Sequence, residues 1–186
     1  MNKKNILKNL ALLTVGALII PAYAAAEIKM GIILGFTGPI EELTPDMGKS
    51  AEMAFKEASD SGQLLGGQKI SVVRADSTCI DAAAATAAAE RLITSDKVVA
   101  IMGADCSGVT TAIANNVAIP NGVTMISPSA TSPALSTIAD NGYFFRTAPS
   151  DARQGQVLAE ITMERGISEV AVTFTNNDYG KGLSDS

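Results

Sequence analysis

Hydroxyl side chains are concentrated in one stretch of the sequence, residues 127–133, which also contains two prolines. The three residues before it are apolar or β-branched and are typical of the end of a buried strand. In open α/β sheets the loops at the carboxyl ends of the strands form the ligand site, and each hydroxyl offers one donor and two acceptor positions. The stretch therefore suits a small polar ligand such as a carboxylate. A turn that hydrogen-bonds only its own backbone is the alternative.

The sequence gives little support to catalysis. It contains no His, the commonest general base and metal ligand, so a Ser-His-Asp triad is excluded. A Ser–Lys pair is not favoured either, because four lysines are expected away from the hydroxyl-rich edge: Lys49, Lys56, Lys69 and Lys97. The glycines of the first turn lack the spacing of a dinucleotide fingerprint, and a net charge of −5 argues against nucleic acid. We therefore expect no enzyme, no cofactor and no metal site.

Residues 1–26 have the three parts of a secretory signal peptide. A short positive segment is followed by an apolar run over 10–20 and then by small residues that end in Ala24 and Ala26. The apolar run is shorter than the ~20 residues that span a bilayer, so a retained membrane anchor is the less favoured alternative. We expect cleavage after Ala24 or Ala26 and export of the protein.

After residue 26, strand-like and helix-like segments alternate. Strands are predicted over 27–35, 69–74, 97–103 and 122–126, and helices between them over 45–59, 81–95 and 107–117. This order predicts an α/β fold with a parallel, doubly wound sheet covered by helices on both faces. An extended segment (143–146), a helix (151–166) and a strand (169–175) follow. Because that strand begins a second sheet and Ser186 comes soon after it, we expect an incomplete reading frame.

Two cysteines follow the second and third predicted strands, so Cys79 and Cys106 both lie at the carboxyl edge of the sheet. Adjacent strands are ~4.8 Å apart, which brings two such residues within reach of disulfide geometry. An exported protein with two cysteines favours a bridge between them. Two free buried thiols and half of a metal site are the alternatives.

Several short motifs occur together in an order and spacing that resemble the amino-terminal lobe of the leucine/isoleucine/valine-binding proteins. They are residues 28–39, 75–79, 103–107, 126–133 and 145–147. Residues 176–182 resemble the segment that opens the second lobe of that family. The resemblance implies the fold of a type I periplasmic binding protein, with a first lobe over 27–147. Residues 148–186 would form the hinge crossing and the beginning of the second lobe.

The resemblance also assigns roles in holding an amino-acid head group. It places the ligand carboxylate on the hydroxyl and N–H of Ser107, which is also suited to cap its helix. Ser129 and Thr131, with Ala130 between them, match positions where a backbone carbonyl and the threonine hydroxyl meet the ammonium. The threonine also meets the carboxylate.

Two further residues are assigned to the ligand site by position. Asp151 lies near an acidic position that the family places at the cleft, and capping of its own helix is the alternative. Tyr179 matches an aromatic residue of the second lobe that closes over the ligand, although it also suits the start of a helix.

The implied function is capture of a branched-chain or other small amino acid between two lobes. The implied protein is a periplasmic, monomeric component of an ABC importer that delivers its ligand to the permease in the inner membrane and binds no nucleic acid. The alternatives are an extracellular sensory or receptor domain of the same fold, a binder of a small amide or carboxylate, and a one-lobe interaction protein.

Overall fold

The computed structural model describes residues 27–186, and the predicted signal peptide, residues 1–26, lies outside the described residues. Its centre is a five-stranded sheet in the order β2-β1-β3-β4-β5, in which every neighbouring pair is parallel. The strands are β1 (Ile28–Leu34), β2 (Ile70–Asp76), β3 (Ala100–Gly103), β4 (Thr124–Ser127) and β5 (Phe144–Arg146). The end of β1 is an apolar run whose side chains are fully buried, as expected for a strand covered on both faces.

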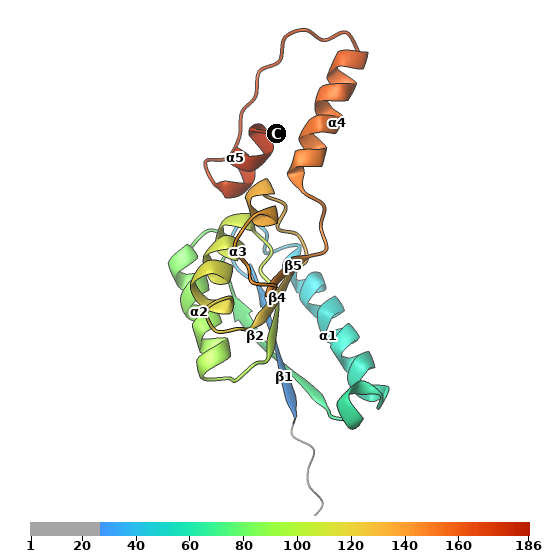
Figure 1. Cartoon of the computed structure of the whole chain (residues 1–186), viewed down its shortest axis with the longest axis vertical. Coiled ribbons are helices and arrows are strands. Elements are labelled where there is room, and N and C mark those ends of the chain that lie inside the picture. The colour runs from blue at the N-terminus through green and yellow to red at the C-terminus, as the bar shows by residue number, and fades with distance from the viewer. Residues whose placement is uncertain (1–26) are drawn as a thin grey trace, which may run out of the picture.

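Helices lie on both faces of the sheet (Figure 1). On one face is α1 (Thr44–Asp60), followed by the short turn η1 (Leu64–Gly66). On the other are α2 (Ala82–Thr94) and α3 (Ser107–Ile113), and α3 continues into a π-helical turn, η2 (Ala114–Ala118). The predicted α/β fold with a parallel, doubly wound sheet is therefore confirmed.

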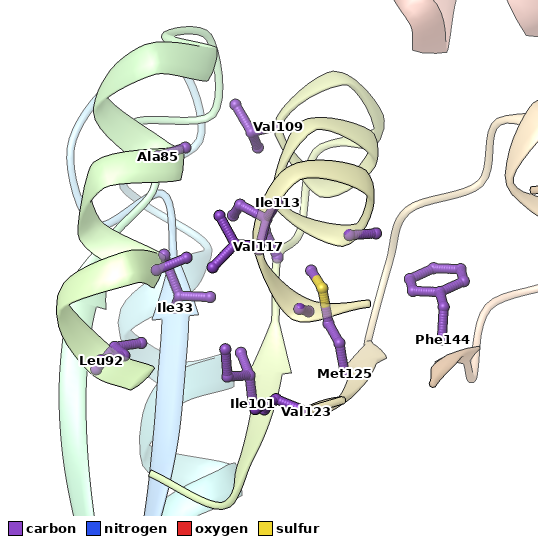
Figure 2. Close-up of a cluster of buried hydrophobic side chains, with 14 of the residues drawn as sticks. Ile33, Ala85, Leu92, Ile101, Val109, Ile113, Val117, Val123, Met125 and Phe144 are labelled. Atoms are coloured by element: carbon purple, nitrogen blue, oxygen red, sulfur yellow. The ribbon is translucent and has the colours of Figure 1, made fainter. Parts of the chain in front are cut away.

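The hydrophobic core lies between the sheet and the helices α2 and α3 (Figure 2). Ile33 and Ile101 from the sheet and Leu92 from α2 are among its fully buried members. Burying a side chain of this size contributes about 1.5–3 kcal/mol. The helix α2 begins at a defined point because the carboxylate of Asp81 accepts hydrogen bonds from two backbone N–H groups of its first turn, each at 3.0 Å.

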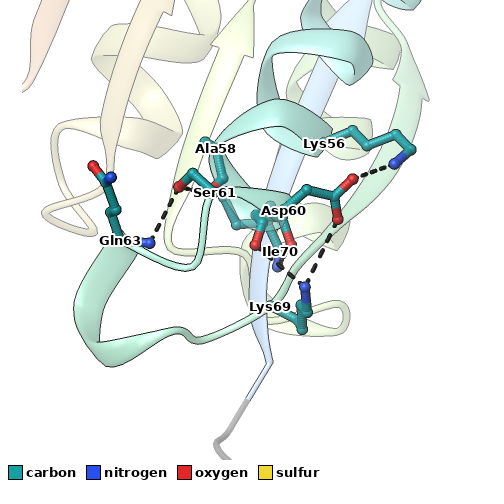
Figure 3. A network of polar contacts seen from close by, with 8 residues as sticks. Lys56, Ala58, Asp60, Ser61, Gln63, Lys69 and Ile70 are labelled. Atoms are coloured by element: carbon teal, nitrogen blue, oxygen red, sulfur yellow. Dashed lines mark hydrogen bonds and ion pairs between the residues drawn. The ribbon is translucent and has the colours of Figure 1, made fainter.

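A polar network fixes the return from α1 to β2 at the opposite end of the sheet from the candidate site (Figure 3). Asp60 pairs with Lys56 on the same helix and with Lys69, whose Nζ lies 3.7 Å from its Oδ1. The backbone N–H of Ile70 donates to the hydroxyl of Ser59 at 3.1 Å. These charged groups are exposed, so the network sets the geometry of the turn more than it stabilises the fold.

Residues 148–186 project beyond the carboxyl edge of the sheet (Figure 1). Helix α4 (Asp151–Glu164) leads away, and the chain returns through 165–177 to α5 (Asp178–Ser184), which contacts the turn η3 (Pro133–Ser136). The prediction of a strand over 169–175 is wrong: this segment has no strand structure. Alternation of apolar residues indicates only that a segment can pair, and no strand of the described residues lies beside it.

Within the described part of the chain, no helix is both long enough and apolar enough to span a membrane.

Candidate functional site

The strand order places the reversal of the sheet between β1 and β3, and ligands of open α/β sheets bind at the carboxyl ends of the strands beside such a reversal. The two strands approach closely there. Gly103 ends β3 with a φ of 130°, and a Cβ at this position would overlap the carbonyl oxygen of Ile33. Only glycine fits at this position. The residues that follow β3 therefore lie close to the end of β1, where Asp105 contacts Gly35.

The carboxylate of Asp105 joins the loops that follow β1, β2 and β3. Its Oδ2 accepts from the N–H of Gly35 at 2.7 Å, and its Oδ1 accepts from the hydroxyl of Ser77 at 3.2 Å and from the N–H of Cys106 at 2.9 Å. Asp105 is 3% exposed. A buried carboxylate needs such partners, so this residue holds the frame of the site in place. Sequence reasoning did not identify it, although it stands inside one of the family-like motifs.

The predicted disulfide between Cys79 and Cys106 is present, with the two Cα atoms 5.2 Å apart. The geometric reason differs from the expectation, because β2 and β3 are not neighbours: β1 lies between them. The bridge instead crosses the end of β1, and a Cβ on Gly35 would lie 3.2 Å from the Cβ of Cys79. The disulfide therefore ties the same loops that Asp105 joins.

Ser107 is the first residue of α3 and is 2% exposed. Its hydroxyl oxygen accepts from the N–H of Ser132 at 3.1 Å. The preceding residue, Cys106, gives no side-chain cap to the helix. The first N–H groups of α3 therefore receive no hydrogen bond from the Cys106 side chain, and the positive end of a helix favours an anion.

The loop after β4 is held by side chains beneath it. The buried hydroxyl of Ser127 donates to the carbonyl of Ala104 at 2.5 Å and accepts from the N–H of Ala130 at 3.0 Å. Arg146 on β5 donates to the carbonyls of Ala130 and Ser132 at 3.2 and 2.8 Å. The backbone of this loop is therefore fixed, and the exposed Ser129 stands on it with its hydroxyl donating to the carbonyl of Asp105 at 3.1 Å.

Thr131 is joined to Asp151 twice. Its hydroxyl lies 2.8 Å from Oδ2 of Asp151, and its carbonyl accepts from the N–H of Asp151 at 2.9 Å. Asp151 is 3% exposed. It does not cap its helix, because Ser150 does so by accepting from the N–H of Ala152 at 3.3 Å. The capping alternative for Asp151 is therefore wrong.

Hydrogen bonds tie five of the six predicted site residues to one edge of the sheet: Ser107, Ser129, Ala130, Thr131 and Asp151. Tyr179 is not joined to them by a hydrogen bond within the described residues, although its helix α5 contacts α3 and η3. It lies in the first turn of α5, is 45% exposed, and forms no side-chain hydrogen bond with a described residue. A pocket of about 390 Å³ lies between η3 and α5. Its lining includes Asp178 and Lys181, the neighbours of Tyr179, and it shares Ser132 and Pro133 with the hydroxyl-rich stretch 127–133.

The described residues contain no group of three or more His, Cys, Asp or Glu side chains placed to hold a metal ion.

Hydroxyl groups and a helix start without a side-chain cap therefore lie together at the carboxyl edge of a parallel α/β sheet. A family described as "Periplasmic binding protein" matches residues 27–186. The chain belongs to this family.

Individual proteins agree with this assignment. The chain is 32% identical to "Leu/Ile/Val-binding protein homolog 3" of Brucella melitensis, over 88% of this chain and 43% of that protein. It resembles an ABC transporter substrate-binding protein from Desulfitobacterium hafniense in complex with Leu, with a TM-score of 0.68 and 28% identity over 86% of this chain and 45% of the other.

A solute-binding protein of Rhodopseudomonas palustris BisB5 in complex with 3,4-dihydroxybenzoic acid has a TM-score of 0.73 over 86% of this chain and 42% of the other. At 22% identity it shows the shared fold alone. The chain spans about half the length of the curated relatives it matches.

Proposed function

We propose that the complete protein is the periplasmic substrate-binding component of an ABC importer and that it captures a branched-chain or other small amino acid. The observation that carries this proposal is the set of polar groups at one edge of the sheet: Ser107 at an uncapped helix start, beside Ser129 and Thr131 on a rigid loop. The relative from Brucella melitensis and the leucine complex from Desulfitobacterium hafniense support this choice of ligand.

The polar groups suggest how the head group is held. The ligand carboxylate lies at the start of α3, against the hydroxyl and N–H of Ser107. The ammonium lies against the loop after β4, near Ser129, Ala130 and Thr131. No bond is made or broken in this function, which agrees with the absence of His from the sequence.

We also propose that residues 27–147 form the first lobe and that 148–186 form the crossing and the beginning of a second. Large apolar side chains of the second segment, such as Leu158 and Phe174, are about half exposed. A further layer of protein packed on them would account for both their apolar character and the greater length of the relatives. Tyr179 closes over the ligand when the lobes come together, and the closed form is delivered to the permease.

The second candidate is a protein that binds a small carboxylate without an amino group, since a helix start without a side-chain cap favours an anion whatever else the ligand carries. The same fold also serves as a ligand-binding domain of a receptor, and the two uses differ in their partner rather than in the site described here.

Titration calorimetry on the complete gene product tests the proposal, with leucine, isoleucine, valine and 3,4-dihydroxybenzoate as ligands. We expect an aliphatic amino acid to bind and the aromatic acid to bind more weakly. The variant Thr131→Ala is expected to lose affinity by about 10- to 100-fold, since a hydrogen bond to a charged group contributes about 1.5–3 kcal/mol. The matched control is Thr94→Ala on the exposed side of α2, far from the edge. Binding of the aromatic acid alone would replace the amino-acid proposal by the second candidate.

A further inference from the structure

Two hydroxyl protons at the candidate site, those of Thr131 and Ser129, are held in hydrogen bonds within the protein. In its ionised form a carboxylate accepts hydrogen bonds and donates none, so the proton in the 2.8 Å contact between Thr131 and Asp151 belongs to Thr131. The hydroxyl of Thr131 then faces any ligand with its lone pairs. It can accept a hydrogen bond from the ligand and has none left to donate.

Toward a ligand, the hydroxyl of Ser129 can also only accept a hydrogen bond, whereas the hydroxyl of Ser107 can donate one. Ser129 donates its proton to the backbone carbonyl of Asp105, which can only accept, and so also presents lone pairs. The oxygen of Ser107 already accepts from the N–H of Ser132, so its own proton remains available to a ligand. The edge thus presents a donor at the start of α3 and two acceptors on the loop after β4.

Asp151 is held firmly enough to maintain this pattern. Its backbone N–H donates to the carbonyl of Thr131 at 2.9 Å, so each residue fixes the other by two hydrogen bonds. Ser150 caps α4 in its place, which leaves the carboxylate of Asp151 free for this contact. With the side chain 3% exposed, little space remains for another rotamer.

We propose that Asp151 is a positioning residue that determines ligand class: by taking the proton of Thr131, it makes the site accept an ammonium group and disfavour a ligand that has only a carboxylate. A carboxylate placed against Thr131 would make no hydrogen bond with its hydroxyl, because both groups could only accept. An ammonium there would donate a hydrogen bond to the oxygen of Thr131. The inference rests on the proposed function, because it assumes that amino acids are the ligands.

The experiment compares two ligands that differ only in the ammonium group, leucine and 4-methylpentanoate, by calorimetry or competition on the complete gene product. The measured quantity is the ratio of the two affinities. In Asp151→Leu, which removes the acceptor at similar size, we expect this ratio to fall by about 10- to 100-fold. In Asp151→Asn, whose amide oxygen still accepts from Thr131, we expect the ratio to stay within about threefold of the parent.

Thr131→Val provides the second arm and does not depend on whether Asp151→Leu folds. Removing the hydroxyl is expected to lower the ratio by about tenfold or more, and adding Asp151→Leu to this variant is expected to lower it no further, because Asp151 acts through Thr131.

Three results would overturn the inference. Equal losses for both ligands would mean that Asp151 only supports the fold. A fall in Asp151→Asn as large as that in Asp151→Leu would mean that its charge acts on the ligand directly. A ratio unchanged in Thr131→Val would remove that hydroxyl from ligand choice. If the parent protein binds no amino acid at all, it is the proposed function that fails.

Discussion

The sheet region, residues 27–147, and the projecting region, residues 148–186, have similar patterns of apolar residues. They differ in how far those side chains are buried. In the sheet region, apolar side chains of β1, α2 and α3 such as Ile33, Leu92 and Ile113 are buried against one another. In the projecting region Leu158, Met163, Val170 and Phe174 are all more than half exposed. Periodicity makes a segment able to form a buried face, and burial then depends on a second surface. The sheet region supplies both surfaces within the described residues.

The largest expected effect tests this contrast directly. Leu92→Ala in the core is expected to lower the free energy of unfolding by about 3–5 kcal/mol, because it removes buried methyl groups and leaves a cavity. The matched change Leu158→Ala, at a side chain that is 52% exposed, is expected to change it by less than about 0.5 kcal/mol. Urea unfolding measures both. Similar losses in the two variants would show that α4 is buried in solution and would contradict the difference between the two regions.

The next largest effect concerns the bridge across the carboxyl edge. Replacing Cys79 and Cys106 together by Ser is expected to lower the free energy of unfolding by about 3–4 kcal/mol, as the chain-entropy treatment gives for a separation of 27 residues. Thermal unfolding with and without a reducing agent measures the effect, which should be absent in the double variant. The neighbouring exposed Ile80→Ala serves as control. A parent that is insensitive to reduction would contradict the prediction.

A smaller effect is expected at the polar support beneath the candidate site. Ser127→Ala leaves the carbonyl of Ala104 and the N–H of Ala130 without their buried partner, which is expected to cost about 1–3 kcal/mol. Ser168→Ala, at an exposed position of the projecting region, is the matched control and is expected to be nearly neutral. Chemical unfolding compares the two. Equal values would mean that water satisfies the groups that Ser127 leaves.

The smallest effect is electrostatic and lies on the surface of the sheet region. The guanidinium of Arg74 donates to both carboxylate oxygens of Glu52, at 2.6 and 2.8 Å, and this hydrogen bonding lowers the pKa of Glu52. Both side chains are more than a third exposed, so solvent limits the contribution to about 0.2–1 kcal/mol.

The pH dependence follows from the direction of that shift. Because the pKa of Glu52 is lower in the folded state, the stabilisation is fully present above the unfolded value, about 4.3, and is lost as the pH falls through the folded value. The difference in unfolding free energy between the parent and Glu52→Gln should therefore disappear in acid. Glu57→Gln on the same helix is the control. A difference that persists at pH 2 would show that the contact acts through packing rather than charge.

Much of the sheet region could be predicted because its segments carry their own signals. The strand predicted over 27–35 is observed as Ile28–Leu34, and the helix predicted over 81–95 is observed as Ala82–Thr94 with Asp81 at its start. The helix predicted over 107–117 ends earlier as an α-helix and continues as a π-helical turn. Hydrophobic period does not distinguish these two windings over so few residues.

The contacts between distant segments could not be predicted in this way. The pairing of Thr131 with Asp151 and of Asp105 with Gly35 depends on how loops from different strands meet, and these loops are brought together only by the strand order. The disulfide prediction was confirmed, but the strands before the two cysteines are not adjacent, because β1 lies between β2 and β3. The prediction of a strand over 169–175 was wrong because an apolar pattern does not indicate whether another strand is present to pair with it.

Gly103 has a consequence for how this protein can change over time. Its backbone conformation and its contact with the carbonyl of Ile33 close the position to every side chain larger than a hydrogen atom. Ser129, on the loop after β4 at the same edge, is exposed and open to replacement. Mutation can therefore alter which ligand the site accepts by replacing side chains on the loop after β4. Gly103, which ends β3 at the same edge, cannot be replaced in this way. Ligand preference can therefore change by substitution in descendants of this sequence, while Gly103 has to be kept.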